Sequence, residues 1–121
     1  MQNLRNSARK NWKSYGFALK GLRWMLGENN FRIQLVAAVV VVALGFKLQL
    51  RQTHWLVILL CIGGVLSAEI FNTAIEKLCD HLHPEQHPNI GKVKDMAAAG
   101  VLVIAMVAAV IGGLVFYQYL V

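Results

Sequence analysis

Charged side chains are scarce in this sequence, and acidic ones are the scarcest. Of the 121 residues, 15% are charged and 57% are hydrophobic, and six Asp and Glu stand against twelve Lys and Arg. The apolar residues come in long blocks, not in the short periodic patterns of a soluble core. The composition therefore excludes an ordinary soluble domain and predicts a single integral-membrane domain over residues 1–121.

Cysteine and proline are also rare. Cys61 and Cys79 lie 18 residues apart on one predicted helix, too far apart to form a disulfide, so we interpret both as free thiols. The two prolines, Pro84 and Pro88, fall in one predicted loop. The first 30 residues contain no apolar core of the kind found in cleaved signal peptides, so we expect the first span to act as its own insertion signal.

Two nucleotide-binding motifs are absent. The sequence contains neither a GxxxxGK[ST] loop nor a kinase-type GxGxxG loop. The net charge of +6 would suggest nucleic acid in a soluble domain. Here the basic residues cluster beside the predicted spans, which favours anionic lipid and membrane orientation and predicts no nucleic-acid partner.

The pattern predicts an all-α membrane protein with three transmembrane helices and an N-terminal amphipathic surface helix. In the surface helix, apolar residues recur every three or four positions between Lys and Arg, and three glycines predict breaks (Gly16, Gly21 and Gly27). Such a helix is compatible with a simple anchor, or with one that also covers a site and offers cations to a phosphate. The expected bounds are 1–30 for the surface helix and 31–50, 55–82 and 96–121 for the membrane helices, with a polar turn at 49–54 and a loop at 83–91.

Lys and Arg are distributed unevenly around the spans. Ten of the twelve lie before Gln34 or around the second loop, so the N-terminus and that loop are predicted to be cytoplasmic. All six acids fall on the same side, which membrane insertion does not require and which therefore indicates cytoplasmic chemistry. Small residues every fourth position in the last span (Ala105, Ala109 and Gly113) favour self-association.

Acidic side chains enter the second span, where they are costly and tend to mark function. If this span is one helix, Glu69, Asn72, Glu76 and Asp80 fall within about 80° of arc on one face. This stripe runs from within the bilayer out toward water. Glu69 is the deepest member, so it is a candidate general base for a group that is itself in the membrane, such as a lipid hydroxyl.

The acids nearer the surface suit a different task. Glu28 and Glu76 could share one Mg²⁺, which usually takes one or two carboxylates together with substrate phosphates. Lys94 and Asp95 are expected to begin the last helix, and a lysine beside a helix N-terminus is a suitable place for a phosphate. Metal and phosphate at the surface, with a base just below, predict phosphoryl transfer from ATP to a lipid alcohol.

Other interpretations remain open at this point. Carboxylates at a cytoplasmic helix end are commonly just solvated, and the chain could be a non-catalytic membrane accessory protein. Zinc bound by Asp80 with the nearby histidines is a further alternative, although their spacing fits no strong template (His81, His83 and His87).

Three motifs carry a resemblance to a known family. The stretch from Glu69 to Glu76, E-I-F-N-T-A-I-E, is followed by Lys94-Asp95, and Glu28 is followed by Phe31-Arg32. These resemble the small bacterial integral-membrane diacylglycerol kinases, a family that includes undecaprenol kinases, over nearly the whole chain. The resemblance implies a homotrimer with active sites shared between subunits, ATP and Mg²⁺, a location in the bacterial inner membrane, and a fold unrelated to soluble kinases.

The resemblance also implies roles for particular positions. Glu69 matches the proton acceptor, and Asn72 and Ala98 match positions at the lipid substrate. The positions that match ATP ligands are Glu28, Glu76, Glu85, Gln86, His87, Lys94, Asp95, Arg9 and Phe17, with Glu28 and Glu76 also matching metal ligands.

The lipid is less sharply indicated. Residues 30–34 lack an acid that the diacylglycerol branch can carry, Ala98 replaces a serine, and His87-Pro88 is similar to the undecaprenol branch. We expect diacylglycerol, giving phosphatidic acid, as the first choice, with undecaprenol as the alternative.

Overall fold

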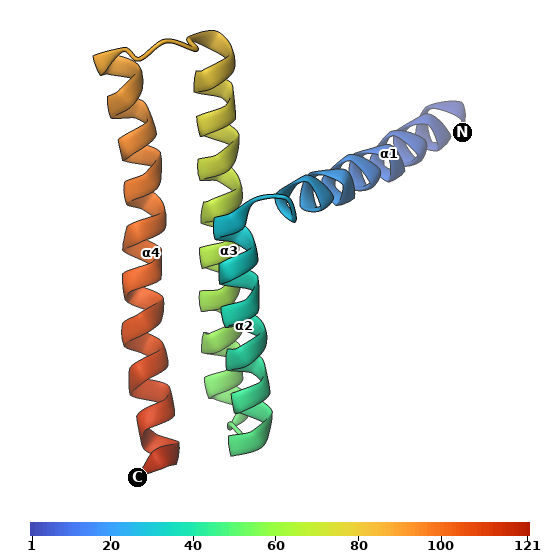
Figure 1. Cartoon of the computed structure of the whole chain (residues 1–121). Helices are drawn as coiled ribbons and strands as arrows, with labels where there is room; N and C mark the ends of the chain where they lie inside the picture. The colour runs from blue at the N-terminus through green and yellow to red at the C-terminus, as the bar shows by residue number, and fades with distance from the viewer.

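The computed structural model describes residues 1–121 and contains four helices and no strands (Figure 1). They are α1 (Gln2–Met25), α2 (Asn29–Leu48), α3 (Gln52–Leu82) and α4 (Pro88–Leu120). The last three are long and apolar enough to cross a membrane. The predicted all-α class with three membrane helices after an N-terminal helix is confirmed.

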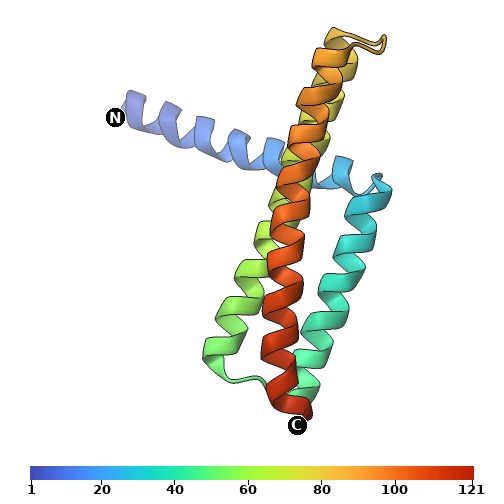
Figure 2. The ribbon, with the colours of Figure 1, turned by 90° about the vertical axis from the view of Figure 1, so that its left-hand side faces the viewer.

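The three membrane helices form an open bundle. α3 packs against α4 along its length and against α2 over part of it, and α1 projects sideways from the bundle (Figures 1 and 2). α3 and α4 continue past the start of α2, and the loop that joins them lies at this extended end. The bundle therefore presents a two-helix projection on the side where α1 joins.

The turn between α2 and α3 is tighter than expected, spanning 49–51 rather than 49–54. Gln49 adopts a left-handed conformation with φ of 55°, and the Leu50 N–H donates to the Gly45 carbonyl at 3.1 Å. This Schellman-type arrangement pairs carbonyls that the helix end would leave free. A Cβ on Gly45 would lie 2.6 Å from the Trp55 ring, so glycine permits this close approach of the two helices.

The expected boundary between the second loop and the last helix is also wrong. The α3–α4 loop covers only 83–87, and α4 begins at Pro88 rather than near 92–96. Proline is well suited to the first turn of a helix, and the His87 ring accepts a hydrogen bond from the Asn89 N–H at 3.1 Å. Of the three expected breaks in the N-terminal helix, only the one at Gly27 is present, because α1 ends at Met25. α1 runs through Gly16 and Gly21, since an interior glycine costs only about 1 kcal/mol relative to alanine.

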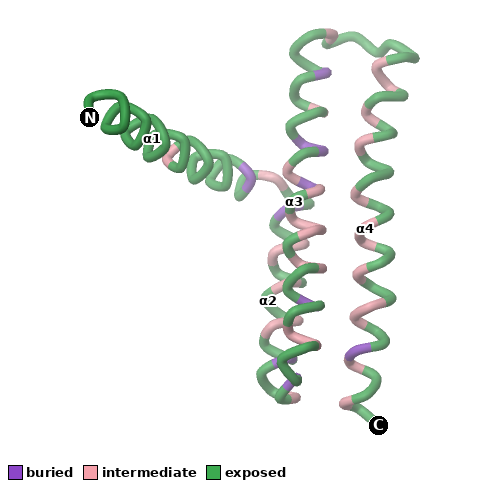
Figure 3. Tube along the Cα trace, turned by 180° about the vertical axis from the view of Figure 1, so that it is seen from behind, coloured by how far each residue is buried: buried purple, intermediate pink, exposed green.

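Few residues are buried within one chain, and these face the seams between the helices (Figure 3). The apolar core is a small cluster of Leu50, Ile58 and Val115, with Trp55 and Phe116 packed around it. The outward faces of α2, α3 and α4 carry exposed Leu, Val and Ile. A hydrocarbon surrounding suits these faces, because a membrane bundle needs no polar outer surface.

The end of α4 is tied to the α2–α3 turn through Tyr119. Its hydroxyl oxygen accepts a hydrogen bond from the Arg51 N–H at 2.8 Å and lies 2.6 Å from His54 Nδ1. The two rings also meet edge to face, with centroids 5.5 Å apart. These contacts close the end of the bundle opposite the α3–α4 loop.

We predict that Tyr119→Phe lowers the free energy of unfolding by about 1–2 kcal/mol, because two hydrogen bonds are lost. Thermal unfolding in detergent micelles measures this change. Tyr117→Phe is the matched control, since Tyr117 is exposed and its hydroxyl has no hydrogen bond. Equal effects of the two substitutions would contradict the role of Tyr119.

Candidate active site

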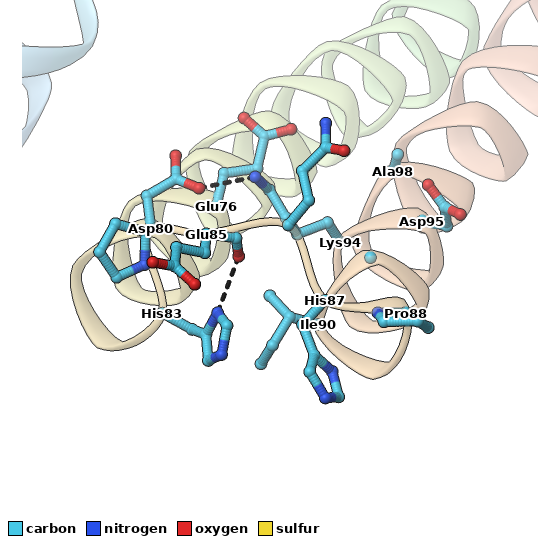
Figure 4. A pocket seen from close by; sticks show the side chains of 13 residues that line it. Glu76, Asp80, His83, Glu85, His87, Pro88, Ile90, Lys94, Asp95 and Ala98 are labelled. Carbon is cyan, nitrogen blue, oxygen red and sulfur yellow. Dashed lines mark hydrogen bonds and ion pairs between the residues drawn. The ribbon is translucent and has the colours of Figure 1, made fainter.

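A polar cavity of about 710 Å³ lies between the end of α3, the 83–87 loop and the start of α4 (Figure 4). The sequence motifs from three separate segments meet here. The expected site residues that line it are Glu76, Glu85, Gln86, His87, Lys94, Asp95 and Ala98. Five others lie elsewhere: Glu69 and Asn72 deeper on α3, Glu28 between α1 and α2, and Arg9 and Phe17 on α1.

The charges of this cavity are unbalanced. Four carboxylates line it, and Lys94 is the only Lys or Arg that does so. Lys94 precedes the uncharged part of α4. Its ammonium donates a hydrogen bond to Asp80 at 2.6 Å, and this hydrogen bond raises the pKa of Lys94. A triphosphate would meet net negative charge here, so it needs a cation with it to bind.

Lys94 was expected at the N-terminus of the last helix, but the structure does not place it there. α4 begins at Pro88, so Lys94 lies almost two turns inside the helix. The lysine is directed toward α3 and reaches Asp80 across the cavity (Figure 4). Its suitability for a phosphate therefore depends on its own charge and not on the helix end.

The polar stripe on α3 has a buried part and a part that lines the cavity. α3 is continuous from Gln52 to Leu82, so the predicted helical face holds. Glu69 is 4% exposed, and its carboxylate accepts a hydrogen bond of 3.4 Å from Gln34 on α2. Asn72 is also buried and donates to Glu76 at 3.3 Å, which links the deep part of the stripe to the cavity.

Glu28 lies just before α2 and forms an ion pair with Lys77 at 2.9 Å. Lys77 follows Glu76 on α3, so the ion pair brings Glu28 beside the part of α3 that carries Glu76. No group of three His, Cys, Asp or Glu side chains is gathered as a metal site. Mg²⁺ needs only one or two carboxylates when phosphates complete its shell, so this donor set suits a nucleotide-bound ion.

The histidines of the loop have structural partners. The His83 ring donates to the Glu85 carbonyl at 2.7 Å, and the His87 ring caps α4. The two rings meet edge to face, with centroids 5.2 Å apart. This arrangement shapes the cavity wall.

Arg9 and Phe17 are not brought to the cavity. Both lie exposed on α1, which leaves the bundle before reaching the α3–α4 projection (Figure 1). Within one chain, they therefore take no part in the site.

Three residues at or beside the site had no role in the expected phosphoryl transfer, although Asp80 and His83 belonged to the zinc alternative. Asp80 was recognised in the stripe, but its pairing with Lys94 depends on how α3 meets α4. Gln34 was noticed as the one strongly polar residue of the first span, and that polarity was the available signal. His83 reaches the cavity only through the course of the loop.

The chain is similar to characterised proteins over most of its length. The profile of the prokaryotic diacylglycerol kinase family matches residues 16–116. An undecaprenol kinase of Bacillus subtilis is 38% identical over 93% of this chain and 92% of its own length. A diacylglycerol kinase of Escherichia coli strain K12 is 33% identical over 81% of each chain, and that of Haemophilus influenzae is 27% identical over 84% of this chain and 87% of its own.

The buried carboxylate below a polar cavity fits a membrane enzyme, and the relatives define its class. The chain belongs to the prokaryotic diacylglycerol kinase family. It is a lipid kinase of the membrane that uses ATP.

We predict that Lys94→Met weakens ATP binding about tenfold or more, because the cavity loses its ammonium. Stability should change by less than about 1 kcal/mol, since the Lys94–Asp80 pair is largely exposed. Titration with ATP in micelles and thermal unfolding measure the two effects. Lys92→Met is the matched control on the same part of α4, outside the cavity. Unchanged ATP affinity would contradict this role.

Proposed function

We propose that this chain transfers the γ-phosphoryl group of ATP to the hydroxyl of a membrane lipid alcohol, with Glu69 as general base. The observation that carries the proposal is the buried Glu69 carboxylate on the same face of α3 as two acids of the polar cavity, Glu76 and Asp80. Glu69 and Glu76 are seven residues apart, about 10 Å along α3. A lipid hydroxyl near the membrane surface and a nucleotide in the cavity can meet between them.

In the proposed step, the lipid hydroxyl gives its proton to the Glu69 carboxylate. The alcohol oxygen forms a bond to the γ-phosphorus, and the bond from that phosphorus to the β–γ bridging oxygen breaks, so ADP leaves. Lys94 neutralises charge on the phosphates, Asn72 holds Glu76, and the loop residues 85–87 contact the nucleotide. Catalysis is mostly positioning and charge neutralisation.

Glu28 and Glu76 are the proposed ligands of a Mg²⁺ ion. A Mg²⁺ ion held by these two carboxylates would supply positive charge that neutralises the phosphates during transfer. The excess of carboxylates in the cavity supports a bound cation, and the Lys77 ammonium on Glu28 occupies a position that suits a positive charge.

We place undecaprenol ahead of diacylglycerol as the acceptor. Identity with the Bacillus subtilis undecaprenol kinase is higher and extends further than identity with the Escherichia coli diacylglycerol kinase. The His87-Pro88 pair, similar to the undecaprenol branch, agrees with this order. This ranking reverses the one expected from the sequence, where diacylglycerol was the first choice. Diacylglycerol is now the second candidate.

We further propose a homotrimer in the bacterial inner membrane with a cytoplasmic N-terminus. The exposed apolar side chains of α1, including Trp12 and Tyr15, support a membrane surface or another subunit as its partner. A second subunit could bring Arg9 and Phe17 to a cavity that they do not reach within one chain. The mass of the detergent-solubilised protein distinguishes one chain from three.

A transfer assay tests this proposal. Protein in mixed micelles receives labelled ATP and Mg²⁺, with undecaprenol or diacylglycerol in separate reactions. We expect label in undecaprenyl phosphate, with less in phosphatidic acid. Glu69→Gln should lower kcat by about 100-fold or more, because the amide cannot accept the proton, while the protein still inserts and assembles.

Each outcome has a distinct meaning. Preferred labelling of diacylglycerol would reverse the order of the two lipids and leave the chemistry intact. Full activity of Glu69→Gln would remove the proposed base. No label in either lipid, from protein shown to be folded, would contradict both acceptors.

The metal assignment makes a separate prediction. Glu76→Gln should raise the Mg²⁺ concentration needed for half-maximal activity about tenfold or more, because a proposed ligand loses its charge. Lys77→Met should lower it roughly twofold to fivefold, since Glu28 loses a weak competing partner. Mg²⁺ titrations of the transfer rate measure both. An unchanged Mg²⁺ requirement in Glu76→Gln would contradict the assignment of Glu76 as a metal ligand. An unchanged Mg²⁺ requirement in Lys77→Met would contradict the proposed competition between Lys77 and Mg²⁺ for Glu28.

A further inference from the structure

Gln34 is a polar side chain in an apolar helix. It lies on α2 within the uncharged stretch 33–46, and its Nε2 is 3.4 Å from Glu69 Oε2 on α3. Its carbonyl oxygen Oε1 is buried and has no hydrogen-bond partner. The same side chain thus makes one long hydrogen bond and leaves one acceptor free.

Packing alone does not account for this glutamine. A buried carbonyl without a partner is destabilising, whereas an apolar side chain of the same length would fill the space without that cost. The side chain also lines an apolar cleft of about 500 Å³ between α2, α3 and α4, where the other lining residues are mostly hydrophobic. The amide is therefore best explained by what it does for Glu69.

We propose that Gln34 is a positioning residue that serves Glu69 in both of its protonation states. A carboxylate needs a donor, and the Nε2–H group supplies one. A carboxylic acid needs an acceptor for its O–H, and Oε1 is the free acceptor on the same amide. Rotation of the amide by about half a turn exchanges the positions of the Nε2–H donor and the Oε1 acceptor. This rotation is accessible because the terminal torsion of glutamine is broad.

This inference rests on the proposed function, in which Glu69 is the general base. Before transfer, the Nε2–H group orients the Glu69 carboxylate toward the lipid hydroxyl. The alcohol proton then moves to Glu69 as the new oxygen–phosphorus bond forms, and the resulting O–H donates to Gln34 Oε1. The proton later passes to water, and the amide returns. The present bond is long, as catalytic hydrogen bonds commonly are before substrates bind.

The arrangement works because the two partners are on different helices. Gln34 comes from α2 and Glu69 from α3, so the contact fixes the carboxylate across a helix interface. The Thr73 hydroxyl, one turn along α3, is the other side-chain hydrogen-bond partner of Glu69. Gln34 is the partner that comes from a different helix, so its loss should misorient the base relative to α2 without changing the nucleotide cavity, which it does not line.

The test is Gln34→Met, which keeps the length of the side chain and removes both polar atoms. We expect kcat for lipid phosphorylation to fall about tenfold or more, because a hydrogen bond to a charged group is lost. The KM for ATP should stay within about twofold, and the unfolding temperature should be unchanged or higher, since the unpaired carbonyl is gone. Gln118→Met is the matched control, because that amide bonds only to the Leu114 carbonyl of its own helix.

Three results would overturn the inference: an unchanged kcat, a raised KM for ATP, or a kcat and an unfolding temperature that fall together. The last would indicate a structural role. The Glu69→Gln enzyme separates this test from that of the function. If Glu69→Gln is inactive and Gln34→Met is fully active, only the role of Gln34 fails. If Glu69→Gln is active, the base itself is misassigned.

Discussion

Hydrocarbon cannot hydrogen-bond to a peptide, and this constraint governs the whole chain. Three helices satisfy their backbone groups internally and face lipid with Leu, Val and Ile. Within such a bundle, a polar side chain is expensive wherever it is buried. The pairing of Gln34 with Glu69 is therefore informative in a way that it would not be in a soluble protein.

The length of α3 determines how the site is divided. Its 31 residues run without interruption from the tight 49–51 turn to the 83–87 loop. Glu69 lies where α2 still covers the helix, and Glu76 and Asp80 lie where α4 and the loop form the cavity. One helical face thus joins an apolar environment suited to a lipid hydroxyl with a polar one suited to a nucleotide.

The three membrane helices and the polar stripe on α3 were predictable from the sequence. Membrane spans appear as long apolar blocks, and Glu69 and Glu76 are acidic residues within or next to such a block. The start of α4 was missed, since a proline was interpreted as a loop residue when it occupies the first helical turn. The Lys94–Asp80 and Glu28–Lys77 pairs were not predictable, because each depends on the offset between two helices, which no single-helix pattern encodes. Arg9 and Phe17 lie exposed on α1 and do not reach the cavity within one chain, so the contacts expected of them are not formed there.

The rigidity of α3 has a consequence for the surrounding bilayer. Because Glu69, Glu76 and Asp80 lie on one continuous helix, their separation is fixed, while their height relative to the headgroups depends on the hydrophobic thickness of the membrane. A thicker or thinner bilayer tilts or shifts the whole helix at a cost of fractions of a kcal/mol per Å. The depth of Glu69 relative to the headgroups therefore changes with the thickness of the bilayer and with the acyl chain length that sets it.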